Sequence, residues 1–198
     1  MKIATIVGSA THVKYTARVF GRYESETPPA PSDYSFGSFV SIEADGRRRG
    51  VAVVADSAVV NPAYAEFGPR LSDANQLREF SPDVLDERGT EISLVAVGTL
   101  ETGGTAEQGI PPLAFQAGAG VRKLEIEEIA SFHLLESGLK LAYFGVLIEH
   151  CGALGTSLVE RIAANLAESL DLEEDEVARL DVLRRSVRWQ RTVGKSNL

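Results

Sequence analysis

Apolar and polar positions alternate with a period of two over much of the first hundred residues, and this pattern predicts β-strands. Strands are predicted in four segments, which are residues 3–7, 14–23, 34–56 and 91–100. In the last of them both faces are apolar, which suggests a strand buried on both sides. Between the last two segments, the chain loses the alternation and predicts two short helices, at residues 72–79 and 81–89. Surface connections are predicted at the proline-rich residues 24–33 and at the Gly- and Thr-rich residues 101–112. Several short strands joined in this way favour a small closed β-barrel over a parallel α/β sheet.

The segment 34–56 carries the strongest local signal, because Asp45-Gly46 separates two apolar runs. An Asp-Gly pair in that position predicts a β-hairpin with a two-residue loop. Such a loop sets Glu43 opposite Arg48 and Val40 opposite Val51. The predicted hairpin then has one apolar face, made by Val40, Ile42, Val51 and Val53.

From residue 125 onward the apolar positions recur every three to four residues, which predicts helices. One helix starts near Ile126, and a second pattern runs from Leu139 to His150. After a glycine-containing break, Thr156 or Ser157 is expected to cap a third helix. A last helix begins with acidic residues and ends with arginines, the arrangement that the helix dipole favours. The sequence therefore predicts an α+β protein with a small closed β-barrel at residues 1–124 and a helical module at residues 125–198.

Composition places the chain among ordinary globular proteins, with 44% apolar and 24% charged residues. Its single cysteine, Cys151, has no partner for an internal disulfide, which fits a reducing compartment. Only a short apolar run lies between Lys2 and Gly8, so a secretory signal is not expected. The longest apolar run of the second half is interrupted by Glu149 and His150, and no membrane span is expected either. These features predict a cytoplasmic protein.

The net charge of −8 argues against a general binder of polyanions, because nonspecific nucleic-acid affinity comes mainly from Lys and Arg. Local basic patches remain at the hairpin turn and near the C-terminus. Arg47, Arg48 and Arg49 at the turn are the candidate contacts for a partner protein or, more weakly, for nucleic acid. The alternative is that both patches are ordinary solvated faces.

Short motifs spread over residues 1–133 resemble the N-terminal HAS-barrel domain of the HerA family of hexameric DNA-translocating ATPases. Their order and spacing carry the resemblance, and they are Ile6-Val7-Gly8-Ser9-Ala10-Thr11, Phe36-Gly37-Ser38-Phe39-Val40, Gly50-Val51-Ala52-Val53-Val54, Leu94-Val95-Ala96-Val97-Gly98 and Gly109-Ile110-Pro111-Pro112-Leu113-Ala114. The resemblance implies a barrel that assembles a ring and offers a docking surface to a nuclease partner.

The ATPase motor that follows the barrel in that family has no counterpart in this sequence. Gly194-Lys195-Ser196 matches the end of a phosphate-binding loop, but the motif needs a glycine where Trp189 stands. Only two residues follow Ser196, which leaves no helix to cradle a phosphate. ATP hydrolysis is therefore not expected.

Candidate catalytic groups are few and dispersed. The histidines are His12, His133 and His150, and the last is adjacent to Cys151. Neighbouring helical positions point about 100° apart, so His150 and Cys151 do not predict a metal site, and Cys151 is expected to be a buried, inert thiol. The carboxylates that a two-metal nuclease would need lie in separate segments, at Asp33, Glu43, Asp56, Asp73 and Glu91. No catalytic, cofactor-binding or metal-ligating residue is predicted.

The leading hypothesis is a non-enzymatic, HerA-like barrel protein that acts as an oligomerisation or adaptor subunit for a DNA-processing ATPase or nuclease. It predicts a homo-oligomer that binds a partner protein and no membrane. One alternative is a metal-dependent nuclease or nucleotide hydrolase whose site is built from the dispersed carboxylates. A third is passive binding of a nucleotide or nucleic acid through residues 47–49.

Overall fold

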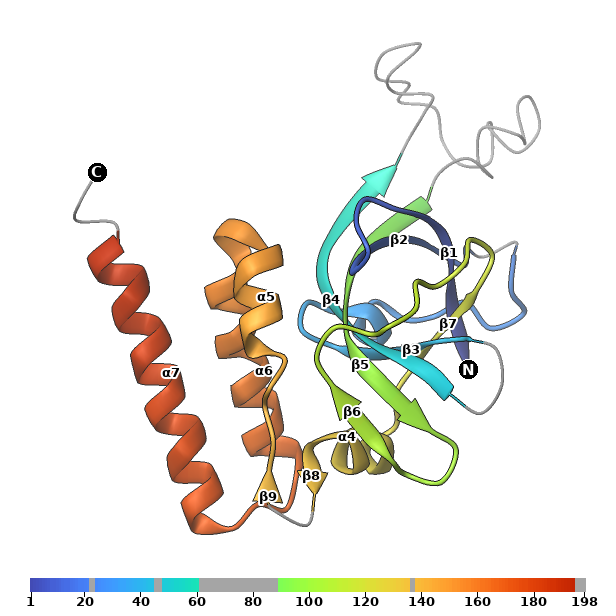
Figure 1. Ribbon diagram of the computed structural model, residues 1–198. Helices are drawn as coiled ribbons and strands as arrows, with labels where there is room; N and C mark the ends of the chain where they lie inside the picture. The colour runs from blue at the N-terminus through green and yellow to red at the C-terminus, as the bar shows by residue number, and fades with distance from the viewer. Residues whose placement is uncertain (22–23, 45–47, 61–88, 136–137, 195–198) are drawn as a thin grey trace.

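A closed barrel and a group of helices make up the computed structural model, which describes residues 1–21, 24–44, 48–60, 89–135 and 138–194 (Figure 1). Seven of the described strands form one antiparallel sheet. They are β1 (Lys2–Ser9), β2 (Lys14–Val19), β3 (Phe39–Ile42), β4 (Arg48–Val60), β5 (Gly89–Glu101), β6 (Ala106–Gln108) and β7 (Gly120–Lys123). A short 3-10 helix, η1 (Pro31–Tyr34), precedes β3.

Six of these strands close into the predicted barrel. Their order is β2-β1-β7-β3-β4-β5, and β5 pairs with β2 again to complete the ring. β6 pairs with residues 98–100 of β5, beyond the residues of β5 that pair with β2, and Gly98 is paired with Gln108. Closure satisfies the backbone hydrogen bonds of strands that would otherwise present open edges. The prediction of an α+β fold with a small closed barrel is confirmed.

The predicted hairpin exists, but its register differs by one residue from the prediction. Val40 pairs with Ala52, and Ile42 pairs with Gly50. Because side chains alternate along a strand, this shift moves Val51 and Val53 to the face opposite the one that Val40 occupies. Both faces of β4 are buried, so its apolar pattern could not fix the register. The loop residues 45–47, including Asp45, Gly46 and Arg47, lie outside the described residues.

Other strand predictions hold with changed boundaries. The strands expected at 3–7, 14–23 and 91–100 are β1, β2 and β5, although β2 ends at Val19. Residues 101–112 were expected to be a connection without regular structure, which is wrong in part because β6 forms there. The helices expected at 72–79 and 81–89 fall outside the described residues, except for Gly89, which begins β5.

The second part of the chain contains four α-helices in its described residues. These elements and the short segments between them are α4 (Ile126–His133), β8 (Leu134–Leu135), β9 (Gly138–Leu139), α5 (Phe144–His150), η2 (Gly152–Leu154), α6 (Gly155–Ser169) and α7 (Glu174–Gly194). Leu139 belongs to a strand and not to the helix predicted from it. No cap comes from the side chain of Thr156 or Ser157, because α6 begins at Gly155 and both residues lie inside its first turn.

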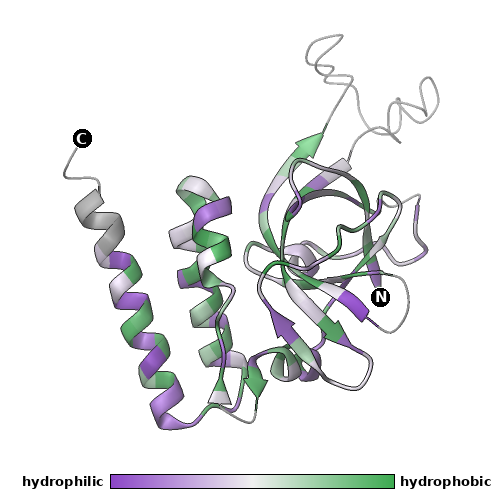
Figure 2. Cartoon of the chain, in the orientation of Figure 1, coloured by the Kyte–Doolittle hydropathy of each residue, from purple (hydrophilic) through white to green (hydrophobic). Residues whose placement is uncertain are grey.

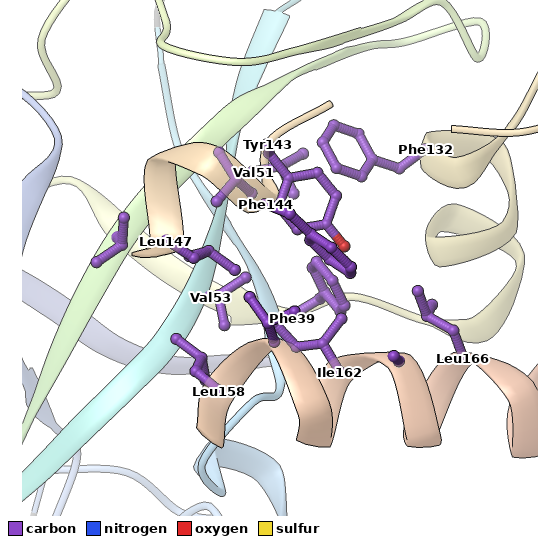
Figure 3. Close-up of a cluster of buried hydrophobic side chains, with 14 of the residues drawn as sticks. Phe39, Val51, Val53, Phe132, Tyr143, Phe144, Leu147, Leu158, Ile162 and Leu166 are labelled. Carbon is purple, nitrogen blue, oxygen red and sulfur yellow. The ribbon is translucent and has the colours of Figure 1, made fainter. Parts of the chain in front are cut away.

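One hydrophobic cluster joins the outer face of the barrel to the helices (Figure 3). Phe39, Val51 and Val53 of the sheet pack there against side chains of α5 and α6, and these helical residues include Phe144, Leu147, Leu158 and Ile162. A second cluster fills the barrel interior, where Val40, Ile42, Ala52 and Val54 meet. The barrel predicted at residues 1–124 and the helical module predicted at residues 125–198 therefore share one core. Among the described helices, none is long and apolar enough to cross a membrane.

Candidate functional site

A groove of about 800 Å³ lies at one end of the barrel. It is bordered by the base of the β3–β4 hairpin and by the segment 111–119, which connects β6 to β7. Arg48, Arg49 and Thr99 line it together with Pro111, Pro112 and Leu113. The structure thus brings together two separate sequence signals, the arginine patch and the Ile-Pro-Pro-Leu motif.

Hydrogen bonds attach the segment 111–119 to the barrel. His12 donates from Nε2 to the carbonyl oxygen of Pro111 at 2.8 Å. The Tyr15 hydroxyl donates to the His12 carbonyl at 2.7 Å and accepts from the backbone N–H of Phe115 at 3.1 Å. His12, one of the candidate acid–base residues, therefore has a structural role in forming one wall of the groove.

Phe115 covers the barrel interior at this end. Its ring packs against Tyr15, with the ring centroids 5.4 Å apart, and contacts the interior cluster. The ring also lies directly over Gly50, where an added Cβ would come within 2.2 Å of the Phe115 ring. Glycine at position 50 is what permits this close approach. The groove is therefore built on a packed aromatic side chain and not on a flexible loop alone.

Large apolar side chains lie exposed beside the groove. Leu113 is 78% exposed and Ile110 is 57% exposed. Single exposed apolar residues are common on protein surfaces, but here Leu113 lines a concave surface that also contains Phe115 and two prolines, and Ile110 directly precedes that lining segment in the chain. Such a surface suits contact with another protein better than contact with water.

Arg48 does not form the predicted pair with Glu43. Its Nε donates to Glu101 on the neighbouring strand, and its Nη1 lies 3.8 Å from a carboxylate oxygen of Glu107. The hydrogen bond to Glu101 raises the pKa of Arg48 above its usual value. Glu43 instead pairs with Lys2 at 3.0 Å. The one-residue register difference moves Arg48 out of line with Glu43, and the pairing of β4 with β5 sets Arg48 opposite Glu101.

Arg49 belongs to a group of three charges that joins β4, β7 and α4. Its Nη2 lies 2.6 Å from Glu128, which also accepts two hydrogen bonds from Arg122. Burial raises the pKa of Glu128, but the bonds from Arg122 and from the backbone N–H of Glu125 outweigh this and leave the pKa below its ordinary value. Carboxylates thus offset the positive charge of both groove arginines, and this lowers the attraction that the groove exerts on a polyanion.

His133 is buried in the shared core and does not face solvent. Its Nδ1 donates to the carbonyl of Ile129 at 2.7 Å, so its Nε2 is the acceptor for the Tyr143 hydroxyl at 2.8 Å. Burial lowers the pKa of His133 to about 4, and the ring is neutral near pH 7. This histidine is a satisfied core residue and not an available general acid or base.

His150 and Cys151 line a second, smaller cavity of about 210 Å³ together with Lys14 and Asp56. Burial raises the pKa of the Cys151 thiol, and the nearby Lys14 offsets only part of that effect. The thiol is therefore in its protonated, less nucleophilic form near pH 7. Sequence spacing gave no sign of this grouping, because Lys14 and Asp56 come from strands far from Cys151 in the chain.

Among the dispersed carboxylates, Asp33, Glu43 and Asp56 each have a different partner. Asp33 pairs with Lys123 at 3.1 Å, and this hydrogen bond keeps its pKa below the usual value. Asp56 accepts from the backbone N–H of Ser57 at 2.8 Å. Glu91 lies on β5, and Asp73 falls outside the described residues. Within the residues that the structure describes, no three His, Cys, Asp or Glu side chains are grouped closely enough to hold a metal ion.

A comparison with curated proteins finds no match. A comparison with protein-family models finds one that matches residues 1–196 and is described as a domain of unknown function, DUF8166. The match covers the barrel, the groove and the helices in one unit. The chain therefore belongs to the DUF8166 family.

Proposed function

We propose that this protein is a non-enzymatic oligomerisation or adaptor subunit that serves a DNA-processing ATPase or nuclease in the cytoplasm. The observation that carries the proposal is the presence of two exposed apolar surfaces at separate places on a barrel and helices that share one core. One is the groove with Leu113, and the other is the outer side of α7, where Val182 and Trp189 are exposed. An adaptor needs two such surfaces, one for each of the molecules it connects.

The resemblance to the HerA barrel supports the choice of partner. The Ile-Pro-Pro-Leu motif and the hairpin strands that carry the resemblance are the elements that border the groove. In the HerA family this barrel assembles rings and offers a docking surface. The groove is therefore the surface on which we expect the partner to dock.

The side chains that an enzyme would need have other tasks in this structure. His12 and His133 are engaged in structural hydrogen bonds, and Asp33 and Glu43 in ion pairs with lysines. These contacts favour a binding role over the alternative of a nuclease or nucleotide hydrolase. Turnover of DNA with Mn²⁺, or of ATP with Mg²⁺, that is lost on changing Asp56 to Asn would support the enzyme instead.

The groove's chemistry predicts what it binds. Leu113 offers apolar contact. The charge of Arg48 at the rim is offset by Glu101 and Glu107, although 53% of its side chain is accessible. We expect selection from a displayed library of random peptides to return segments in which apolar residues predominate. Leu113→Asp should weaken the binding of those peptides by about tenfold or more, as loss of a central apolar contact does.

Val59→Asp is the matched control, because Val59 is 86% exposed and lies on the part of β4 away from the groove. It introduces the same charge and should leave peptide affinity unchanged. A library that yields no binder, or binders that tolerate Leu113→Asp as well as Val59→Asp, would overturn the assignment of the groove.

A further inference from the structure

Helix α7 is the outermost element of the helical module and packs against α6 on one side only (Figure 1). Leu180 and Val187 are buried on that side, and Val177 and Leu183 are half-buried beside them. Arg188 adds an ion pair to Glu160 of α6. One side of α7 thus packs on α6, and the opposite side is exposed to solvent.

The outer side of α7 has a regular pattern of its own. At about 100° of rotation per residue, five of the α7 positions whose burial is described fall within about 40° of the direction opposite Leu180. They are Asp175, Ala178, Val182, Arg185 and Trp189, and all five are exposed. Val182 is 64% exposed and Trp189 is 66% exposed. They are seven residues apart, close to two helical turns, and so face the same way. Two apolar residues, Ala178 and Val182, thus lie between the charged Asp175 and Arg185 on this side of the helix. Figure 2 shows hydrophilic and hydrophobic residues interspersed along α7 as a whole.

Charge along α7 is distributed unevenly. The first turn contains Glu174, Asp175 and Glu176, and arginines occupy the second half of the helix. Among the described residues, neither Asp175 nor Arg185 forms an ion pair. A surface with an acidic half and a basic half repels part of any uniformly charged partner, such as nucleic acid or an anionic membrane. It is complementary to an identical helix that runs in the opposite direction.

We propose that the outer face of α7 pairs antiparallel with the same face of a second copy of this chain. A two-fold axis beside Leu180 sets Ala178 of each copy against Val182 of the other. The same register sets Asp175 of each copy against Arg185 of the other, which gives two intermolecular ion pairs. In this register Trp189 lies level with residue 171, just before the opposing helix begins. Because a helical side chain leans toward the N-terminus of its own helix, its ring reaches toward the first turn of the opposing helix and loses exposure to water. Isologous contacts of this kind are the commonest in homo-oligomers.

This inference rests on the oligomerisation part of the proposed function, and it names the surface that makes the contact. A charge-exchange experiment tests it. Asp175→Arg sets Arg against Arg, and Arg185→Glu sets Asp against Glu, so each single change should weaken dimerisation by about tenfold or more. The double variant with both changes restores two opposite-charge pairs and should dimerise nearly as well as the wild type. Sedimentation equilibrium from low to high micromolar concentration measures all four proteins.

Glu168→Arg is the matched control for Asp175→Arg, because it makes the same change of charge at an exposed position of α6. It should leave dimerisation unchanged. Trp189 is the only tryptophan of the chain, so its fluorescence emission should shift to shorter wavelength as the dimer forms. The shift should be absent in the single variants and should return in the double variant, and circular dichroism checks that every variant is folded.

A double variant that stays as weak as the single variants would overturn the antiparallel pairing, as would a dimer that none of the changes affects. In either case peptide binding at the groove is measured on the same proteins. Retained peptide binding would then leave the adaptor function standing and reject only the α7 contact. Loss of self-association and of peptide binding together would reject both.

Discussion

Acidification from pH 6.5 to about 4 is expected to lower the free energy of unfolding by about 3 kcal/mol through His133 alone. The buried ring has a pKa of about 4 in the folded protein, against 6.5 in the unfolded chain. Between these values the unfolded chain binds a proton that the folded protein does not bind. Stability therefore falls as the pH is lowered through this window, and it is constant with respect to this residue above about pH 6.5.

Urea unfolding at several pH values measures the effect. His133→Gln should remove the slope between pH 6.5 and 4, and His150→Gln, at a half-exposed position, should keep it. If His133→Gln does not fold, NMR titration of the wild-type imidazole gives the same information. A His133 ring that becomes protonated near pH 6.5 in the folded protein would contradict the buried hydrogen bond to Tyr143. Asp33 and Glu128 have pKa values below their ordinary values of 3.8 and 4.5. The stability that they contribute is therefore lost as the pH falls through and below those ordinary values, at the acidic end of the titration.

Replacement of Gly98 by Ala is expected to cost about 3 kcal/mol of unfolding free energy. A Cβ at this position would lie 2.2 Å from the backbone carbonyl oxygen of Glu107 and 3.0 Å from the Phe132 ring. Relief of that contact requires β6 to move away from β5. Gln108 moves with β6, and its side-chain amide donates to the carbonyls of Phe132 and Lys140. The substitution therefore loosens the contact between the barrel and the helical module.

Gly103→Ala is the control for this prediction. Gly103 has a φ of 131°, comparable to the 156° of Gly98, but no atom lies within 4 Å of its added Cβ. Only backbone strain acts there, and the expected cost is about 1 kcal/mol. Thermal or urea unfolding measures the loss of unfolding free energy in both variants. Equal losses would contradict the view that Gly98 is needed for the close approach of β6 to β5.

Local sequence pattern predicted the fold class and most strands, because alternation and turn residues act over a few positions. It predicted the wrong register for β3 and β4, since a strand buried on both faces gives no polar face to orient it. Val51 is apolar whether it faces the barrel interior or α5, and the structure shows that it faces the helices. The register was thus decided by packing between distant segments.

The sequence likewise predicted some features of the candidate site and not others. Arg48 and Arg49 were identified from sequence, and the structure places both in the groove. Their partners were not identified, because Glu101 and Glu128 lie far along the chain and only barrel closure brings them near. The role of Phe115 was also missed, since its contact with Gly50 depends on the path of the segment 111–119. The position of Arg47 and any contact it makes with a partner stay predictions.

Self-association is required both by the oligomerisation part of the proposed function and by the α7 contact. Sedimentation equilibrium of the purified wild-type protein at micromolar concentrations tests it most directly. The molar mass is expected to rise with concentration toward at least twice the chain mass of 21.3 kDa. A mass that stays at 21.3 kDa across the whole range would contradict self-association.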